Sequence, residues 1–318
     1  TELKSLEQVY SLFTSPQSFN QKLLAYHFRK NAKITRNQYM AEIYENVTIN
    51  LSHLAATLIM YCMKNGQQQI NKHCFYKTLY IAIKQLQKVK GIKLHRSLLN
   101  PDEYNDLIEG KSKRFEQFIR VASSSGLIAS YHDNYQFLPK LWEEFDFDMI
   151  RMENLIAVYS NEVEPIKVLF DTLVNAYKIC AKVTQKQLAE WAFNDEIISL
   201  AWDKLQYENP RYDDVNNNER VKENPVPLLL KPKKPNGIAM LLIHGLLASP
   251  AELKDYAEVL VEQGYTVMVV RLKGHGTSPY DLRKQTYEDW FASVQRGLTI
   301  VNAFCHSVVV IGFSTGAA

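Results

Sequence analysis

The distribution of apolar residues divides the chain into two parts. Up to about residue 206, apolar side chains recur every three or four positions, as in 75–89 and 165–183, which predicts a mainly helical region. From residue 237 onwards, continuous apolar runs alternate with helical patterns. The predicted strands and helices alternate at 237–245, 249–264, 265–276, 286–304 and 307–314. Continuous apolar runs are typical of strands buried on both faces, so this part predicts an α/β fold with a parallel sheet.

A polar segment separates the two parts. Residues 207–237 are rich in Asn, Asp and Pro and have an apolar run only at 228–230, which predicts a linker with one short strand. The predicted organisation is a helical domain at 1–160, connecting helices at 161–206, a linker at 207–225 and an α/β domain at 226–318.

Two segments of the helical domain favour a particular structure. Residues 49–63, INLSHLAATLIMYCM, predict a core helix, because they fall short of the roughly 18 apolar residues of a membrane span. A helix ending at Gly126, followed by two strands paired about His132, Asp133 and Asn134, predicts a winged-helix-like hairpin. Winged helices often bind DNA, but on so weakly basic a chain a structural packing role is favoured.

Composition narrows the class of protein. The chain has 318 residues, 46% of them hydrophobic and 22% charged, and a net charge of +3, which gives no reason to expect a nucleic-acid partner. The four cysteines are far apart in sequence and form no C-x-x-C pair, which disfavours a disulfide framework and a zinc site and favours reduced thiols in the cytoplasm. The sequence has neither a clustered set of metal-ligating residues nor a phosphate-binding glycine loop, so we expect no metal and no cofactor.

The sequence VVVIGFSTGAA at the end of the chain carries the clearest chemistry. A serine hydroxyl needs exposure, a base and oxyanion donors before it acts as a nucleophile. A tight strand-to-helix turn at Ser314 provides exposure, and side chains at Gly312 and Gly316 would collide with neighbouring backbone. About seventy residues upstream, His244 and Gly245 end a predicted strand with the kind of turn that supplies an oxyanion donor.

In order and spacing, the segments LLIHGL, RLKGHG and GFSTG at 226–318 resemble the N-terminal half of an α/β-hydrolase, with the closest likeness to monoacylglycerol lipases and small carboxylesterases. The resemblance implies Ser314 as nucleophile and the backbone N–H groups of Leu246 and Thr315 as the oxyanion hole. It implies structural roles in the elbow and its neighbouring loops for His244, Gly245, Gly312, Gly316, Gly274, His275 and Gly276.

The general base is not evident from the sequence. In the α/β-hydrolase family an acid and then a histidine follow the elbow, whereas only two alanines follow it here. His275 and His306 are poor substitutes, since about 20 Å of strand separates His306 from the serine. We expect Asp281, Glu288 and Asp289 to be solvated charges at helix starts. The sequence therefore indicates a fragment of a longer protein, and residues 1–318 alone are expected to be inactive.

The helical domain bears a fainter resemblance to the C-terminal region of bacterial glycerol-3-phosphate and lysophosphatidate acyltransferases. The likeness rests on VTINLSHLAATLIMYCMKNG, RFEQFIRVASSSGLI and RMENLIAVYSNEVEPI. The catalytic pair of that family, a histidine followed five residues later by an aspartate, is absent, so the resemblance implies an acyltransferase site upstream of Thr1. An unrelated helical scaffold is the alternative.

Together these features predict a serine esterase or lipase that acts on acyl esters, in particular glycerolipid esters, in a polypeptide fused to an acyltransferase. The main alternative is a non-catalytic or regulatory hydrolase-like domain, and acyl transfer to an alcohol is a third. The basic and apolar segment 77–96 predicts either peripheral contact with the inner face of the membrane or a solvated basic face over a core stripe, the latter being favoured.

Overall fold

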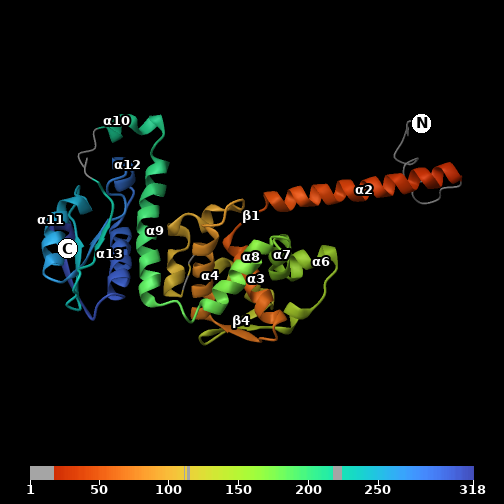
Figure 1. The fold of residues 1–318 in the computed structure, drawn as a ribbon, viewed down its shortest axis with the longest axis horizontal. Coiled ribbons are helices and arrows are strands. Elements are labelled where there is room, and N and C mark those ends of the chain that lie inside the picture. The colour runs from red at the N-terminus through yellow and green to blue at the C-terminus, as the bar shows by residue number, and fades with distance from the viewer. Residues whose placement is uncertain (1–17, 111, 113–114, 218–223) are drawn as a thin grey trace.

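The computed structural model describes residues 18–110, 112, 115–217 and 224–318. The chain forms a helical half, residues 18–217, and a sheet half, residues 224–318 (Figure 1). The long helix α9 (Gln185–Gln206) stands between the body of the helical half and the sheet half (Figure 1). The first 17 residues of the predicted helical domain and residues 218–223 of the predicted linker lie outside the described residues.

The helical half is organised around two buried helices. Its longer elements are α2 (Phe19–Asn46), α3 (Leu51–Lys64), α4 (Lys72–Leu86), α5 (Glu116–Ser124), α6 (Phe147–Glu153), α7 (Leu155–Glu162) and α8 (Lys167–Ile179). Helices α3 and α4 contribute more buried residues to the core than the other described elements, which confirms 49–63 as a core segment. Helix α2 projects away from the other helices (Figure 1). No helix in the described part of the chain has the length and apolar character needed to cross a membrane.

Helix α4 bears out the core stripe predicted within 77–96 and corrects the prediction of a solvated basic face above it. The apolar side chains from Tyr80 to Ile83 are fully buried in the core, so they are not available to a membrane. The ammonium of Lys84 is buried as well and lies 2.5 Å from the carboxylate of Asp195. The basic residues of this segment therefore do not form one solvated face.

Short strands complete the helical half. The strands β1 (Thr48–Ile49) and β3 (Lys93–Leu94) pair in parallel, and β2 (Gln69–Asn71), β4 (Ile128–Tyr131) and β5 (Asn134–Phe137) form an antiparallel sheet in the order β2-β5-β4. The predicted hairpin is confirmed, since β4 and β5 pair across a turn in which His132 has a φ of 48°. Its winged-helix character stays a prediction.

The cysteines of the helical half are closer in space than in sequence. The thiols of Cys74 and Cys180 are free, and their sulfur atoms lie 3.8 Å apart. The hydrogen bond from Cys74 lowers the pKa of the Cys180 thiol to about 6.

The sheet half contains four strands and the helices that connect them. After the short helix α10 (Asp213–Asn216), its elements are β6 (Leu228–Leu230), β7 (Ile238–Ile243), α11 (Lys254–Glu262), β8 (Thr266–Val270), α12 (Pro279–Leu282), α13 (Tyr287–Asn302) and β9 (Ser307–Gly312). The strand order is β6-β8-β7-β9, in which β7 is parallel to both neighbours and β6 is antiparallel to β8. The predicted strands and helices of this half are thus confirmed, and the short strand predicted at 228–230 forms an antiparallel edge, so that the sheet is mixed and not wholly parallel.

Alternate residues of the central strands pack on opposite faces of the sheet, as the two-residue repeat of a strand requires. Val267 and Val269 of β8 pack with α11, whereas Met268 and Val270 pack with α13. Strand β9 differs, because Val310 is 52% exposed, and the expectation that VVVI forms a buried strand is wrong. Among the described strands β9 pairs only with β7, so its other edge is uncovered by the described residues.

Candidate active site

The turn after β9 has the geometry of a nucleophile elbow. Ser314 is exposed and has a φ of 54°, a left-handed conformation that is strained for a residue with a Cβ atom. A Cβ atom on Gly312 would lie 2.1 Å from the carbonyl oxygen of Gly316, and one on Gly316 would lie 2.6 Å from that of His244. Both glycines are therefore required by close backbone contacts, as the spacing of the motif predicts.

The turn after β7 lies directly against the serine. A Cβ atom on Gly245 would be 3.2 Å from the Cβ atom of Ser314 and 3.7 Å from its Oγ atom, so only a glycine fits without displacing the elbow. Among the described residues, no acceptor is recorded for the backbone N–H groups of Leu246 and Thr315. An oxyanion requires hydrogen-bond donors beside the attacking hydroxyl.

The buried ring of His244 stabilises this turn through two hydrogen bonds with the backbone. Its ring is buried, with 1% of the residue exposed, and Nε2 accepts a hydrogen bond of 3.2 Å from the N–H of Leu272. The proton therefore sits on Nδ1, which donates to the carbonyl oxygen of Gly245 at 2.9 Å. Burial lowers the pKa of His244 to about 4, so the ring is neutral at physiological pH. Both ring nitrogens of His244 are thus bonded to backbone groups of the neighbouring turns.

The loop after β8 packs beside the same turn. The ring of His275 is buried and lies edge-on to His244 and Trp290, at centroid distances of 4.9 and 5.6 Å. Gly274 and Gly276 both have positive φ, and a Cβ atom on Gly276 would lie 2.0 Å from Pro225. These contacts place the predicted loop residues in a packed support, away from solvent.

One expectation about nearby acids is wrong. Asp281 is buried, and its carboxylate accepts hydrogen bonds of 2.6 Å from Thr277 and 2.7 Å from Gln285, so it is not a solvated charge. Asp289 does cap the start of α13, through a 2.8 Å bond from the N–H of Thr286. Asp281 therefore holds the loop after β8, and Asp289 holds a helix start.

No histidine of the sheet half, residues 224–318, is placed to act as a base for Ser314. Both ring nitrogens of His244 are engaged, and the ring of His275 is buried against other rings. His306 precedes β9, whereas Ser314 follows it, so the two residues lie at opposite ends of the strand. Within the described residues there is also no cluster of three or more residues that could hold a metal ion.

A second group of residues beside this site was not found by sequence reasoning. Arg271 and Lys273 follow β8 and form ion pairs of 2.7 Å with Asp203 of α9, and Lys273 also lies 2.6 Å from Asp102. Burial alone would raise the pKa of Asp102, but the ammonium of Lys273 outweighs it and holds that pKa below its usual value. The only available signal was two cations directly after a buried strand.

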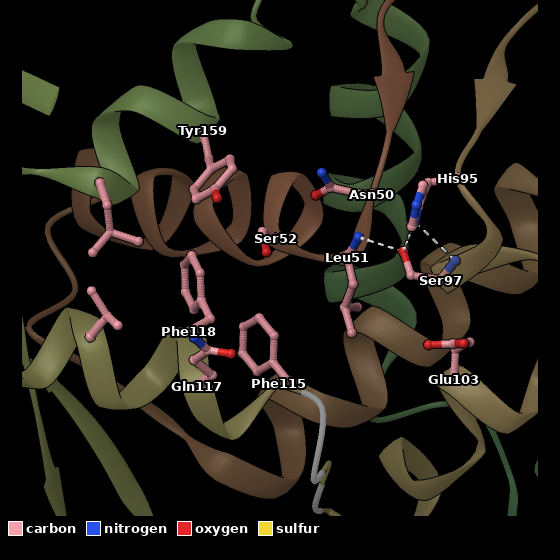
Figure 2. Close-up of a pocket in the computed structure, with 12 residues that line it drawn as sticks. Asn50, Leu51, Ser52, His95, Ser97, Glu103, Phe115, Gln117, Phe118 and Tyr159 are labelled. Carbon is pink, nitrogen blue, oxygen red and sulfur yellow. Dashed lines mark hydrogen bonds between the residues drawn. The ribbon is translucent and has the colours of Figure 1, made fainter.

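A separate pocket of about 520 Å³ lies in the helical half. Figure 2 shows Asn50, His95 and Ser97 at one side and the rings of Phe115, Phe118 and Tyr159 at the other. The hydroxyl of Ser97 accepts a hydrogen bond of 3.3 Å from the N–H of Leu51. None of the residues predicted for the hydrolase site lines this pocket.

Known proteins match part of the chain. It is 39% identical over 79 residues to the thermostable monoacylglycerol lipase of Bacillus sp. (strain H-257). The matched segment covers 25% of this chain and 32% of that protein. It is 32% identical over 79 residues to a carboxylesterase of Bacillus subtilis (strain 168), and this match covers 24% of this chain and 32% of that protein. No protein-family profile matches the chain.

A solved structure from work on two metagenome-derived lipolytic enzymes is 32% identical, with a TM-score of 0.26, and the match covers 28% of this chain and 35% of that one. The chain spans about a third of the length of the curated relatives it matches. Part of the chain is thus similar to a monoacylglycerol lipase and a carboxylesterase, and about three quarters of the chain lies outside these matches.

Proposed function

We propose that the protein is a serine esterase or lipase in which Ser314 is the nucleophile. The observation that carries the proposal is the juxtaposition of a strained, exposed serine with a glycine turn and two N–H groups that have no recorded acceptor among the described residues. The relationship to a monoacylglycerol lipase and a carboxylesterase supports an acyl ester as the substrate class.

The chemistry follows from this geometry. The Oγ atom of Ser314 attacks the ester carbonyl carbon while a general base takes its proton, and the carbonyl oxygen becomes an oxyanion. The N–H groups of Leu246 and Thr315 donate to this oxyanion. The alcohol leaves with the proton, and water then attacks the acyl enzyme and releases the acid. In this proposal Ser314 and the two N–H groups act as the nucleophile and the oxyanion donors, and no histidine of residues 224–318 is positioned as the base.

The finer substrate assignment is also a proposal. Glycerolipid esters fit the name of one relative, and they fit the sequence likeness of 1–160 to the C-terminal region of glycerolipid acyltransferases. That likeness is the whole support for a fused acyltransferase. The curated relatives match about a quarter of the chain, and they carry no information on the remaining three quarters. Peripheral membrane contact stays a prediction, without the support of segment 77–96.

A fluorophosphonate probe, which labels activated serines covalently, tests the proposal on the full-length protein. We expect labelling of the wild type and none of Ser314→Ala. The matched control is Ser307→Ala, which changes an exposed serine at the other end of β9 and is expected to be labelled like the wild type. Labelling that survives in Ser314→Ala would reject this serine as the nucleophile. An unlabelled but folded wild type would favour a non-catalytic hydrolase-like domain instead.

A further inference from the structure

The two halves of the chain meet through ion pairs of one polarity. In every ion pair recorded between described residues of the two halves, the acid belongs to the helical half and the cation to the sheet half. The pairs are Glu190 with Lys231, Asp203 with Arg271, Asp203 and Asp102 with Lys273, and Glu196 with Arg296. This complementarity favours one fixed arrangement of the halves, because the acids and cations face each other only when the two surfaces are aligned in one way.

Asp203 is the centre of this interface. One of its carboxylate oxygens lies 2.7 Å from Arg271 and the other 2.7 Å from Lys273, and the side chains of Asp203 and Arg271 are almost completely buried. Buried charges lose their hydration, so such a group is tolerated only when its partners are held in good geometry. Asp203 therefore fixes the backbone that immediately follows β8.

That backbone leads directly to the proposed oxyanion turn. Arg271 donates from Nη1 to the carbonyl oxygen of His275 at 3.3 Å, which closes the loop after β8. The next residue, Leu272, donates its N–H to Nε2 of His244. His244 in turn donates to the carbonyl oxygen of Gly245, the residue packed against Ser314. Ion pairs, hydrogen bonds, the backbone from Arg271 to Leu272 and the packing of Gly245 against Ser314 thus connect α9 to the elbow.

We propose that the helical half positions the oxyanion turn of the esterase site through Asp203, with Arg271 and His244 as the positioning residues between them. The inference rests on the proposed function for its effect on catalysis, but the positioning itself is a structural property of the contacts among Asp203, Arg271, Leu272, His244 and Gly245. In this proposal the helical half is not merely an attached domain, because it helps to hold the active-site backbone in position. An interface of this kind would make ester hydrolysis sensitive to anything that shifts α9.

The first test measures catalysis in the full-length protein. Asp203→Asn keeps the shape of the side chain and removes its charge. We expect kcat for an acyl ester to fall roughly ten- to hundred-fold with little change in KM, because the donors stabilise the charged oxyanion of the transition state far more than the neutral carbonyl of the bound ester. Glu190→Gln is the matched control, since it removes an exposed acid from the same interface. An unchanged kcat in folded Asp203→Asn would overturn the proposal.

The second test needs no activity. We expect the N–H of Leu272 to exchange slowly with solvent in the wild type and in Glu190→Gln, and several times faster in Asp203→Asn, as measured by NMR-detected hydrogen exchange. If Asp203→Asn does not fold, Arg271→Lys replaces it, because this variant keeps a cation for Asp203 but loses the donor to His275. Equal exchange in all variants would reject the positioning path. If the wild type shows neither turnover nor probe labelling, the proposed function fails, and the exchange measurement alone decides the positioning.

Discussion

The two halves of the chain differ in where their most constrained polar residues lie: the helical half buries them in its interior, whereas the sheet half holds one at its surface. In the helical half, Asp195 accepts hydrogen bonds from Tyr80 at 2.6 Å and Tyr104 at 2.8 Å and forms an ion pair with Lys84, all within the interior. In the sheet half, the strained residue is Ser314, and it lies on the surface. A satisfied interior cluster has no group left to offer a substrate, whereas an exposed serine held by backbone contacts has its hydroxyl available.

The difference indicates where each half obtains its rigidity. The cluster around Asp195 joins α4 to α9 through side chains, and burial raises the pKa of its carboxyl despite the charge of Lys84. The elbow is fixed by backbone packing at Gly312 and Gly316, with no side-chain hydrogen bond recorded between Ser314 and the other described residues. Stability should therefore depend most on the first site and reactivity on the second.

The largest effect is expected from Asp195→Asn. The substitution leaves the buried ammonium of Lys84 without its carboxylate, which destabilises the protein by about 3–5 kcal/mol. Asp171→Asn, on the exposed side of α8, is the control and should unfold at the same denaturant concentration as the wild type. In the folded fraction of Asp195→Asn, Asp203 keeps its pairs with Arg271 and Lys273, so we expect probe labelling to be retained. Loss of labelling without loss of stability would contradict the division between the halves.

A smaller loss of stability, with a complete loss of labelling, is expected from Gly312→Ala. The new methyl group must displace the backbone of Gly316, which we expect to cost about 2–3 kcal/mol, the range of an overpacked site. Because the elbow itself moves, Ser314 should no longer react with a fluorophosphonate. Val310→Ala, at an exposed position of the same strand, serves as the control. A labelled Gly312→Ala would show that the close backbone contacts are not needed for the serine to react.

The sequence was informative wherever the structure depends on local pattern. The strands and helices of the sheet half follow from apolar runs and turn residues, and the elbow follows from two glycines that flank a serine. The partnership of Asp203 with Arg271 could not be predicted in this way, because 68 residues separate them and the polar linker falls between. The exposure of β9 and the burial of Asp281 also depend on what packs nearby, which a single sequence does not encode locally.

The smallest effect in this series concerns His244, which belongs to both sides of the comparison because it is buried and supports the elbow. Its pKa is about 4 in the folded protein and about 6.5 in an unfolded chain, so the unfolded state binds the proton more readily. Stability from this group is complete above about pH 6.5 and decreases as the pH falls towards 4, by about 2 kcal/mol between pH 6.5 and 5.

The ring titration of His244, followed by NMR, is the direct measurement, and a midpoint near 6.5 would contradict the burial argument. Protonation of Nε2 removes the acceptor for the N–H of Leu272, so the protection factor of that amide, its exchange rate relative to that of an unfolded chain at the same pH, should fall as the pH approaches 4. In His244→Gln the stability difference between pH 6.5 and 5 should shrink by the same 2 kcal/mol or so, because the titrating group is gone. A pH dependence identical to that of the wild type would place the proton uptake elsewhere and separate the oxyanion turn from this histidine.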